Sequence, residues 1–157
     1  MSTWIQLISL AALTGTALIG GLLYAFSVCV MRALSRLEPQ AGMRAMQEIN
    51  RVILNPIFLL SFIGTALLSL VIILAKIIGV GDVPFPTFCG ALLYVLGAFI
   101  ITAAGNVPLN NKLDTIDPEC STDFWQIYLK KWVPLNHLRT IACTLAVISY
   151  GIGFIQI

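Results

Sequence analysis

The chain has 157 residues, enough for one domain, but 59% of them are hydrophobic, only 10% are charged and the mean hydropathy is +0.95. A water-soluble domain of this size carries charged side chains at about a quarter of its positions. The composition therefore excludes an ordinary soluble protein, and the net charge of +2 is too small to indicate a nucleic-acid partner.

Four apolar stretches are long enough to cross a bilayer as helices. They lie at about 4–31, 56–78, 84–107 and 135–157. Because backbone groups in lipid must pair within their own segment, we expect an all-α, integral membrane four-helix bundle that forms one domain over residues 1–157. The N-terminus lacks the basic residues and the cleavage site of a signal peptide, so we interpret the first stretch as a span.

Basic residues are concentrated in the first and third connections between these spans. The second connection has only Lys76, whereas the other two hold Arg32, Arg36, Arg44, Arg51, Lys112, Lys130 and Lys131. Cytoplasmic loops are enriched in Lys and Arg. We therefore predict a multi-pass protein whose termini both lie outside the cytoplasm.

The first connection contains a predicted amphipathic helix, because apolar side chains recur at helical spacing between residues 40 and 53. Two interpretations remain open: a helix on the membrane surface, or a solvated extension of the second span. At the boundary, Pro56 either opens the second span as its first helical residue or kinks a continuous helix.

Small residues in the spans indicate close contacts between helices in lipid. The first and third spans contain most of them, at Gly15, Gly20, Gly21, Gly90, Gly97 and Gly105.

Residues 108–134 form the longest polar interval. Within it Trp125, Tyr128, Leu129 and Trp132 share one helical face. We predict an interfacial amphipathic helix between the third and fourth spans, which Pro134 ends.

Polar side chains concentrate at the predicted cytoplasmic ends of all four spans. This polar belt consists of Tyr24, Ser27, Asn50, Arg51, Asn55, Asn106, Asn110, Asn136, His137, Arg139 and Thr140. Polar groups within spans usually face a cavity and mark a site, but they also hold helices together by hydrogen bonds. The sequence leaves both interpretations open.

His137 is the only histidine. An imidazole can accept or donate a proton near neutral pH, so His137 is a candidate general base or acid, and equally a structural residue at the interface. One histidine with dispersed cysteines does not match a zinc or iron ligand set. No acidic residue lies deep within a span, which disfavours a proton-driven transporter.

Several segments of the chain resemble the anthrone oxygenase family of small four-span membrane proteins: GLLYAFSVCVMRAL, AMQEINRVILNPIF, NVPLNNKL and WQIYLKKWVPLNHLRT. The likeness runs in order through almost the whole chain, and NVPLN and NHLRT are its most specific parts. Leu135 departs from it, since we expect an aromatic residue there. The resemblance implies an oxygenase that uses dioxygen, without a metal or organic cofactor, to convert a planar phenolic anthrone to a quinone.

The implied chemistry gives roles to the polar belt. His137 would remove a proton from the substrate, and Arg139 with Asn106 or Asn110 would stabilise the resulting oxyanion. Further candidates for substrate binding are Tyr24, Asn50, Asn55, Trp125, Trp132 and Asn136.

The expected partners are a small apolar aromatic substrate, dioxygen and membrane lipid, and a homo-oligomer is a further possibility. A protein of another class stays open as the alternative. It would be a non-catalytic membrane protein that binds lipid, a quinone or another small apolar molecule, or an accessory membrane subunit.

Overall fold

The computed structural model describes residues 1–119 and 122–155, and this part of the chain contains helices and no strand. In chain order the elements are α1 (Thr3–Ala25), the π-helix η1 (Phe26–Val30), α2 (Met31–Leu34), α3 (Pro39–Ile53), α4 (Pro56–Ile77), α5 (Phe85–Leu92), the π-helices η2 (Leu93–Ile100) and η3 (Thr102–Asn106), α6 (Val107–Asp114) and α7 (Thr122–Ile155).

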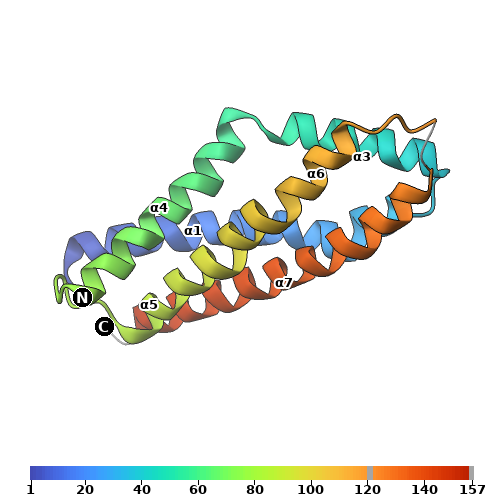
Figure 1. The fold of residues 1–157 in the computed structure, drawn as a ribbon. Coiled ribbons are helices and arrows are strands. Elements are labelled where there is room, and N and C mark those ends of the chain that lie inside the picture. The colour runs from blue at the N-terminus through green and yellow to red at the C-terminus, as the bar shows by residue number, and fades with distance from the viewer. Residues whose placement is uncertain (120–121, 156–157) are drawn as a thin grey trace.

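These elements join into four helices that are long and apolar enough to cross a membrane, which confirms the predicted four-span fold. They cover Thr3–Leu34, Pro56–Ile77, Phe85–Asp114 and Asp123–Ile155. Figure 1 shows an elongated bundle in which the N-terminus and the C-terminal end of α7 lie at the same end. The first, third and fourth helices continue past the predicted spans at the opposite end.

Helix α7 runs without interruption through Pro134, so the predicted end of a helix at this proline is wrong. A separate interfacial helix between the third and fourth spans is not confirmed either, because its residues belong to α6 and α7. Trp125, Tyr128 and Trp132 are buried in one cluster with Met43 of α3. Burial of this aromatic face stabilises a continuous helix, and that gain offsets the backbone donor that the proline lacks.

Helix α4 is the shortest of the four spans, and α3 continues its course toward the far end of the bundle (Figure 1). Pro56 is its first residue, as one of the two interpretations predicted. The Oδ1 atom of Asn55 caps the helix by accepting a hydrogen bond from the Phe58 N–H at 3.0 Å. The helical path is therefore interrupted at Leu54, between α3 and α4, which together occupy one helix position in the bundle.

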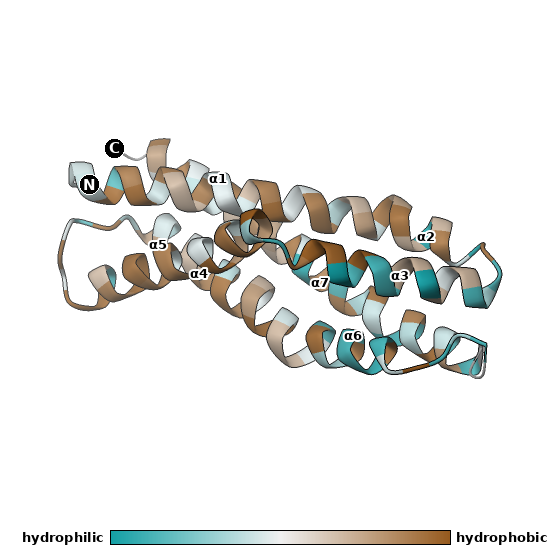
Figure 2. Ribbon diagram, turned by 90° about the horizontal axis from the view of Figure 1, so that it is seen from above, coloured by the Kyte–Doolittle hydropathy of each residue, from teal (hydrophilic) through white to brown (hydrophobic). Residues whose placement is uncertain are grey.

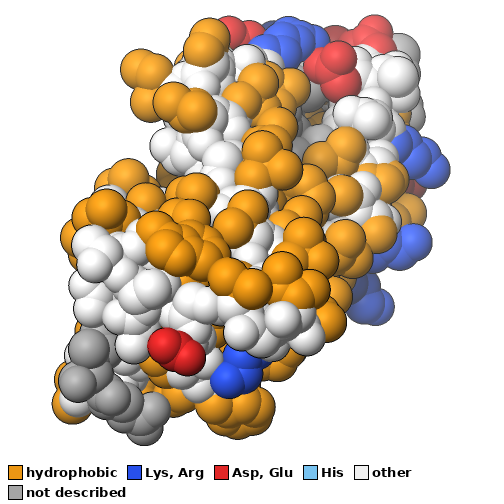
Figure 3. Space-filling view, turned by 90° about the vertical axis from the view of Figure 1, so that its left-hand side faces the viewer, with side chains coloured by type: hydrophobic (Ala, Val, Ile, Leu, Met, Phe, Trp, Pro, Cys, Tyr) orange, Lys and Arg blue, Asp and Glu red, His pale blue; other side chains and the backbone are white. Residues whose placement is uncertain are grey.

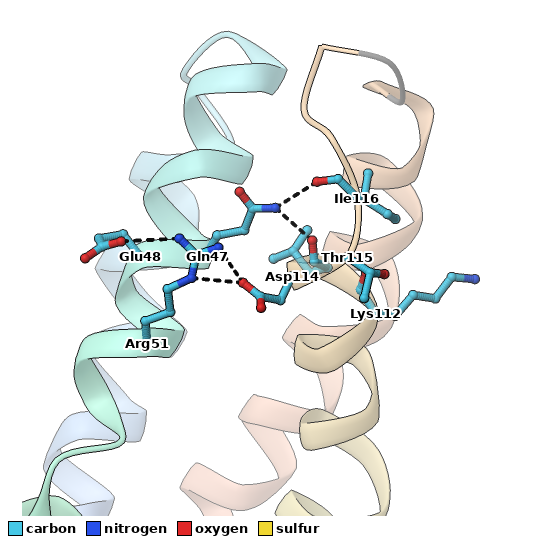
Figure 4. Close-up of polar contacts among 8 residues, drawn as sticks. Gln47, Glu48, Arg51, Lys112, Asp114, Thr115 and Ile116 are labelled. Atoms are coloured by element: carbon cyan, nitrogen blue, oxygen red, sulfur yellow. Dashed lines mark hydrogen bonds and ion pairs between the residues drawn. The ribbon is translucent and has the colours of Figure 1, made fainter.

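Helix α3 packs against α6 and α7. Nε2 of Gln47 donates to the carbonyls of Leu113 and Ile116 at 2.8 and 2.9 Å, and Nη2 of Arg51 donates to Asp114 Oδ1 at 2.7 Å (Figure 4). The Arg51 pair is exposed and contributes little free energy, whereas Gln47 is buried. Figure 2 shows that α3 and α6 form the hydrophilic end of the bundle.

The buried apolar side chains of the described residues form three clusters along the bundle. In the cluster near the termini, the Tyr150 and Ser69 hydroxyls form a hydrogen bond of 3.0 Å. In the middle cluster, the Tyr94 hydroxyl donates to the Phe62 carbonyl at 3.0 Å. Seen from the termini, the surface is largely hydrophobic and most visible charges lie toward the far end (Figure 3).

Close helix contacts occur at some of the predicted glycines and not at others. A Cβ atom added to Gly97 of η2 would overlap the Cβ of Ala142 in α7, and one added to Gly105 would lie 2.9 Å from Leu135. A Cβ added to Gly21 would meet nothing within 4 Å. Gly21 therefore faces away from the helix contacts.

We predict that Gly97→Ala lowers the melting temperature of the detergent-purified protein, because a methyl group forced into a close-packed contact costs about 1–3 kcal/mol. The matched control is Gly21→Ala, which adds the same methyl group to open space and favours the helix. It should leave the melting temperature unchanged or raise it, as measured by scanning fluorimetry. Equal losses in the two variants would contradict the packing described here.

Candidate functional site

A partly enclosed pocket of about 110 Å³ lies beside the break between α3 and α4, in the interior of the bundle. Its apolar walls include Leu23, Phe26, Met46, Leu54 and Phe58. Its remaining walls bring together six of the predicted site residues, Asn50, Asn106, Asn110, Trp132, Asn136 and Arg139, and also Thr102.

Arg139 is buried in this pocket, with 5% of its surface exposed. Its Nη1 donates to Thr102 Oγ1 at 2.9 Å, its Nη2 donates to Asn136 Oδ1 at 2.7 Å, and its Cζ lies 5.3 Å from the centre of the Trp132 ring. Its Nε has no partner, and no acidic side chain pairs with it among the described residues. A buried cation without an anion is unfavourable, so the pocket favours a ligand that carries negative charge.

Asn136 fixes the position of this guanidinium group. Its Nδ2 donates to the Leu23 carbonyl and to Ser27 Oγ, both at 2.8 Å, which ties α7 to the first span. A carbonyl oxygen can only accept, so the amide orientation is determined and Oδ1 faces Arg139. The Leu23 carbonyl lies just before the π-helix η1, where the hydrogen-bond pattern of the helix changes.

Asn110 is held by two aromatic donors. Its Oδ1 accepts hydrogen bonds from the Tyr128 hydroxyl and from Trp132 Nε1, both at 2.8 Å. Because an indole nitrogen can only donate, this contact also determines the amide orientation. The Nδ2 group of Asn110 makes no hydrogen bond in the described structure, so a ligand in the pocket can accept one from it.

Three buried polar atoms in the pocket lack a hydrogen-bond partner among the described residues: Arg139 Nε, Asn50 Nδ2 and Asn106 Oδ1. Asn50 Nδ2 lies near the Tyr128 hydroxyl but forms no hydrogen bond of acceptable geometry. Asn106 Nδ2 donates to the Trp132 carbonyl at 3.4 Å, which leaves its Oδ1 as an acceptor. Each unpaired buried group costs about 1–3 kcal/mol, so the pocket matches a ligand with both acceptor and donor oxygens.

The other four predicted site residues lie outside the pocket. His137 is exposed and lines a separate groove on the outer side of α7, and Tyr24 is 58% exposed. Asn55 caps α4, and Trp125 is packed within the core against Gly42. The structure therefore does not bring His137 together with Arg139.

Thr102 was not among the predicted site residues, but its hydroxyl accepts a hydrogen bond from Arg139. It lies four residues before Asn106 and eight before Asn110, so the three share one helical face. That spacing was visible in the sequence, but a threonine in a span usually bonds back to its own helix, as Thr102 also does with the Ala98 carbonyl.

The described residues contain no group of three or more His, Cys, Asp or Glu side chains that could hold a metal ion. Chemically, the pocket offers a cation, amide donors, one free acceptor and an aromatic wall. These groups can bind, orient and stabilise a planar anion with oxygen substituents.

Residues 46–149, well over half of the chain, match the sequence profile of the family described as "Anthrone oxygenase". The match covers every polar residue that lines the pocket. No curated protein and no solved structure matches the chain significantly. The chain belongs to the anthrone oxygenase family.

Proposed function

We propose that this protein is a membrane-embedded, cofactor-independent oxygenase that converts a planar phenolic, anthrone-like substrate to a quinone with dioxygen. Family membership supports an oxygenase-like function. The observation that carries the mechanism is Arg139, a buried cation that has no acidic partner among the described residues. The substrate would supply the missing negative charge.

The reaction begins with loss of a proton from the methylene carbon of the anthrone, because the resulting enolate is aromatic. The enolate oxygen would accept hydrogen bonds from Arg139 Nε and from the free amide groups of Asn50 and Asn110. A phenolic hydroxyl would donate to Asn106 Oδ1. Donors that are fixed before the reaction, in a site shielded from water, stabilise developing charge strongly.

The residues that line the pocket include no Asp, Glu, His, Lys, Cys or Tyr side chain. We therefore propose that a water molecule takes the proton at the end of the pocket nearest the hydrophilic end of the bundle, and that Arg139 drives ionisation by stabilising the anion. A role for His137 as general base stays a prediction from the sequence. The pocket geometry favours a mechanism without it, because its imidazole lies on another face of α7.

The oxidation then needs no further group from the protein. The enolate gives one electron to dioxygen, and the two radicals combine through a new C–O bond to give a peroxide. The peroxide anion takes back the proton that water received in the first step. Loss of water then breaks the O–O bond and the remaining C–H bond, so one oxygen atom becomes the quinone carbonyl and the other leaves as water. The protein residues bind, orient and exclude bulk water.

The pocket is smaller than a tricyclic substrate, since a cavity of about 150 Å³ holds only a benzene-sized ligand. We propose that one ring enters the pocket and that the others lie in its open side. Ile53, Leu54 and Val107 line that side with apolar surface, and Leu54 is 64% exposed. The break between α3 and α4 leaves this side uncovered.

We further propose that the hydrophilic end of the bundle faces the cytoplasm, as the distribution of Lys and Arg suggests. Helix α4 has 22 residues and spans about 33 Å, close to the thickness of the hydrocarbon layer. Its first residue, Pro56, would then lie at the membrane boundary, so that an apolar substrate reaches the pocket from the lipid.

We predict that Arg139→Gln lowers kcat/KM for a simple anthrone by about 100-fold or more, because it removes the charge that stabilises the enolate. Arg139→Lys, which keeps the charge, should retain part of the activity. The assay is oxygen uptake with quinone formation by the purified protein, corrected for uncatalysed oxidation.

The matched control is His137→Ala on the same helix, which should keep a rate close to wild type because its side chain lies outside the pocket. A folded Arg139→Gln protein that keeps full activity, or a folded His137→Ala protein that loses it, would contradict the proposed site. A wild-type protein that binds the quinone but takes up no oxygen would instead indicate the non-catalytic binding protein.

We predict that Leu54→Trp raises KM for a tricyclic anthrone, because a larger side chain at the open side would block the outer rings. Ile57→Trp is the control, since Ile57 is 80% exposed and does not line the pocket. Steady-state kinetics of both variants test the direction of entry. Equal KM values for the two variants would show that the substrate does not pass Leu54.

A further inference from the structure

A second groove, of about 570 Å³, lies on the outer side of the bundle between the first span and α7. It is separate from the pocket, and the two share no lining residue. Ser27, Met31, Arg32 and Ser35 form one wall, and a single face of α7 that includes Lys130 and His137 forms the other. The groove is open, so in a membrane it faces lipid or the lipid head groups.

The groove is positively charged. Arg32 and Lys130 are exposed, and their side chains and that of His137 form no hydrogen bond or ion pair within the described structure. No acidic side chain lines the groove. The nearest acids along the chain are Glu38, which follows α2, and Asp123, which lies two turns before Lys130 on α7. The free cations therefore favour an anionic occupant.

The chemistry of the groove changes along the membrane normal. Lys130 lies near the hydrophilic end of the bundle, and His137 lies seven residues, or about 10 Å, deeper on the same face of α7. Still deeper on this face are Ile141 and Ile148, which are 55% and 52% exposed. The order from basic through polar to apolar matches a phospholipid, whose phosphate, glycerol esters and acyl chains follow each other at similar spacing.

We propose that this groove is a binding site for the head group of an anionic phospholipid. The phosphate would lie between Arg32 and Lys130, and His137 would donate a hydrogen bond to the glycerol region. The acyl chains would continue deeper, along the exposed side chains of Ile141 and Ile148. A soluble anion would use the basic residues but leave the apolar wall unoccupied, which is why the observations favour a lipid. The proposal does not depend on the oxygenase function.

The test is native mass spectrometry of the detergent-purified protein, titrated with phosphatidylglycerol and with phosphatidylcholine of the same acyl chains. The wild-type protein should bind phosphatidylglycerol more tightly. Arg32→Gln combined with Lys130→Gln should weaken that binding by about tenfold and leave phosphatidylcholine binding nearly unchanged.

The control is Arg36→Gln combined with Lys131→Gln, which removes the same charge from exposed positions outside the groove. It should keep the preference for phosphatidylglycerol. If the groove double variant melts at a lower temperature without lipid, the two single variants are titrated instead, and each should show part of the loss.

Three results would overturn the proposal. The first is a wild-type protein with no preference between the two lipids. The second is an equal loss in both double variants, which would indicate unspecific attraction to surface charge. The third is inorganic phosphate that competes with phosphatidylglycerol at equal concentration, which would indicate a site for a soluble anion.

Discussion

A guanidinium group that has no acidic partner among the described residues lies inside this bundle, and neighbouring helices hold it in place through hydrogen bonds. Arg139 is tied to the third span through Thr102 and to the first span through Asn136. Removal of a cation from water costs several kcal/mol, and hydrogen bonds to neutral groups offset only part of that cost. If the residue served only to join helices, an apolar side chain of similar volume would do so at lower cost. The anionic ligand that we propose would compensate the buried charge.

Irregular helices make room for this arrangement. The π-helix η3 carries Thr102 and Asn106, which both line the pocket, and the Leu23 carbonyl that accepts a hydrogen bond from Asn136 lies just before the π-helix η1. Turns of π-helix occur often at functional sites. Helices α3 and α4 together occupy one of the four helix positions in the bundle. The break between them, at Leu54, leaves one side of the pocket open. Polar chemistry thus lies inside the bundle, while the pocket stays open on one side.

The four spans followed from apolar runs, because lipid allows few alternatives to a helix of sufficient length. The full length of the helices was not predicted, because the polar residues of α6 and of the first turns of α7 suggested a connection between two spans. The sequence did not show which residues bury the aromatic face of α7. Trp125 and Tyr128 pack against α3, and the periodicity of one segment does not show which other segment will cover its apolar face. The same contact keeps α7 helical through Pro134.

The sequence predicted that polar side chains from several spans lie at one level of the bundle, and six of the predicted site residues do line one pocket. It did not predict the direction in which each side chain points around its helix. Asn136 and Arg139 are three residues apart and share a face, whereas His137 is rotated by about 100° from Asn136 and points outward. Knowledge of which face of α7 meets the first span was needed to separate them. Thr102 could have been found from its spacing to Asn106 and Asn110, because all three lie on one face.

The most direct test of the buried charge is a binding titration that follows quenching of the Trp132 fluorescence, in a variant that lacks the other tryptophans. The two ligands would be an ionised hydroxyanthraquinone and its neutral methyl ether, measured at the same pH. If Arg139 binds an anion, the wild-type protein binds the ionised ligand at least about tenfold more tightly than the neutral ether, a difference of about 1.4 kcal/mol in binding free energy. The Arg139→Gln variant then loses that preference. Equal affinity of the wild-type protein for the two ligands would contradict the account.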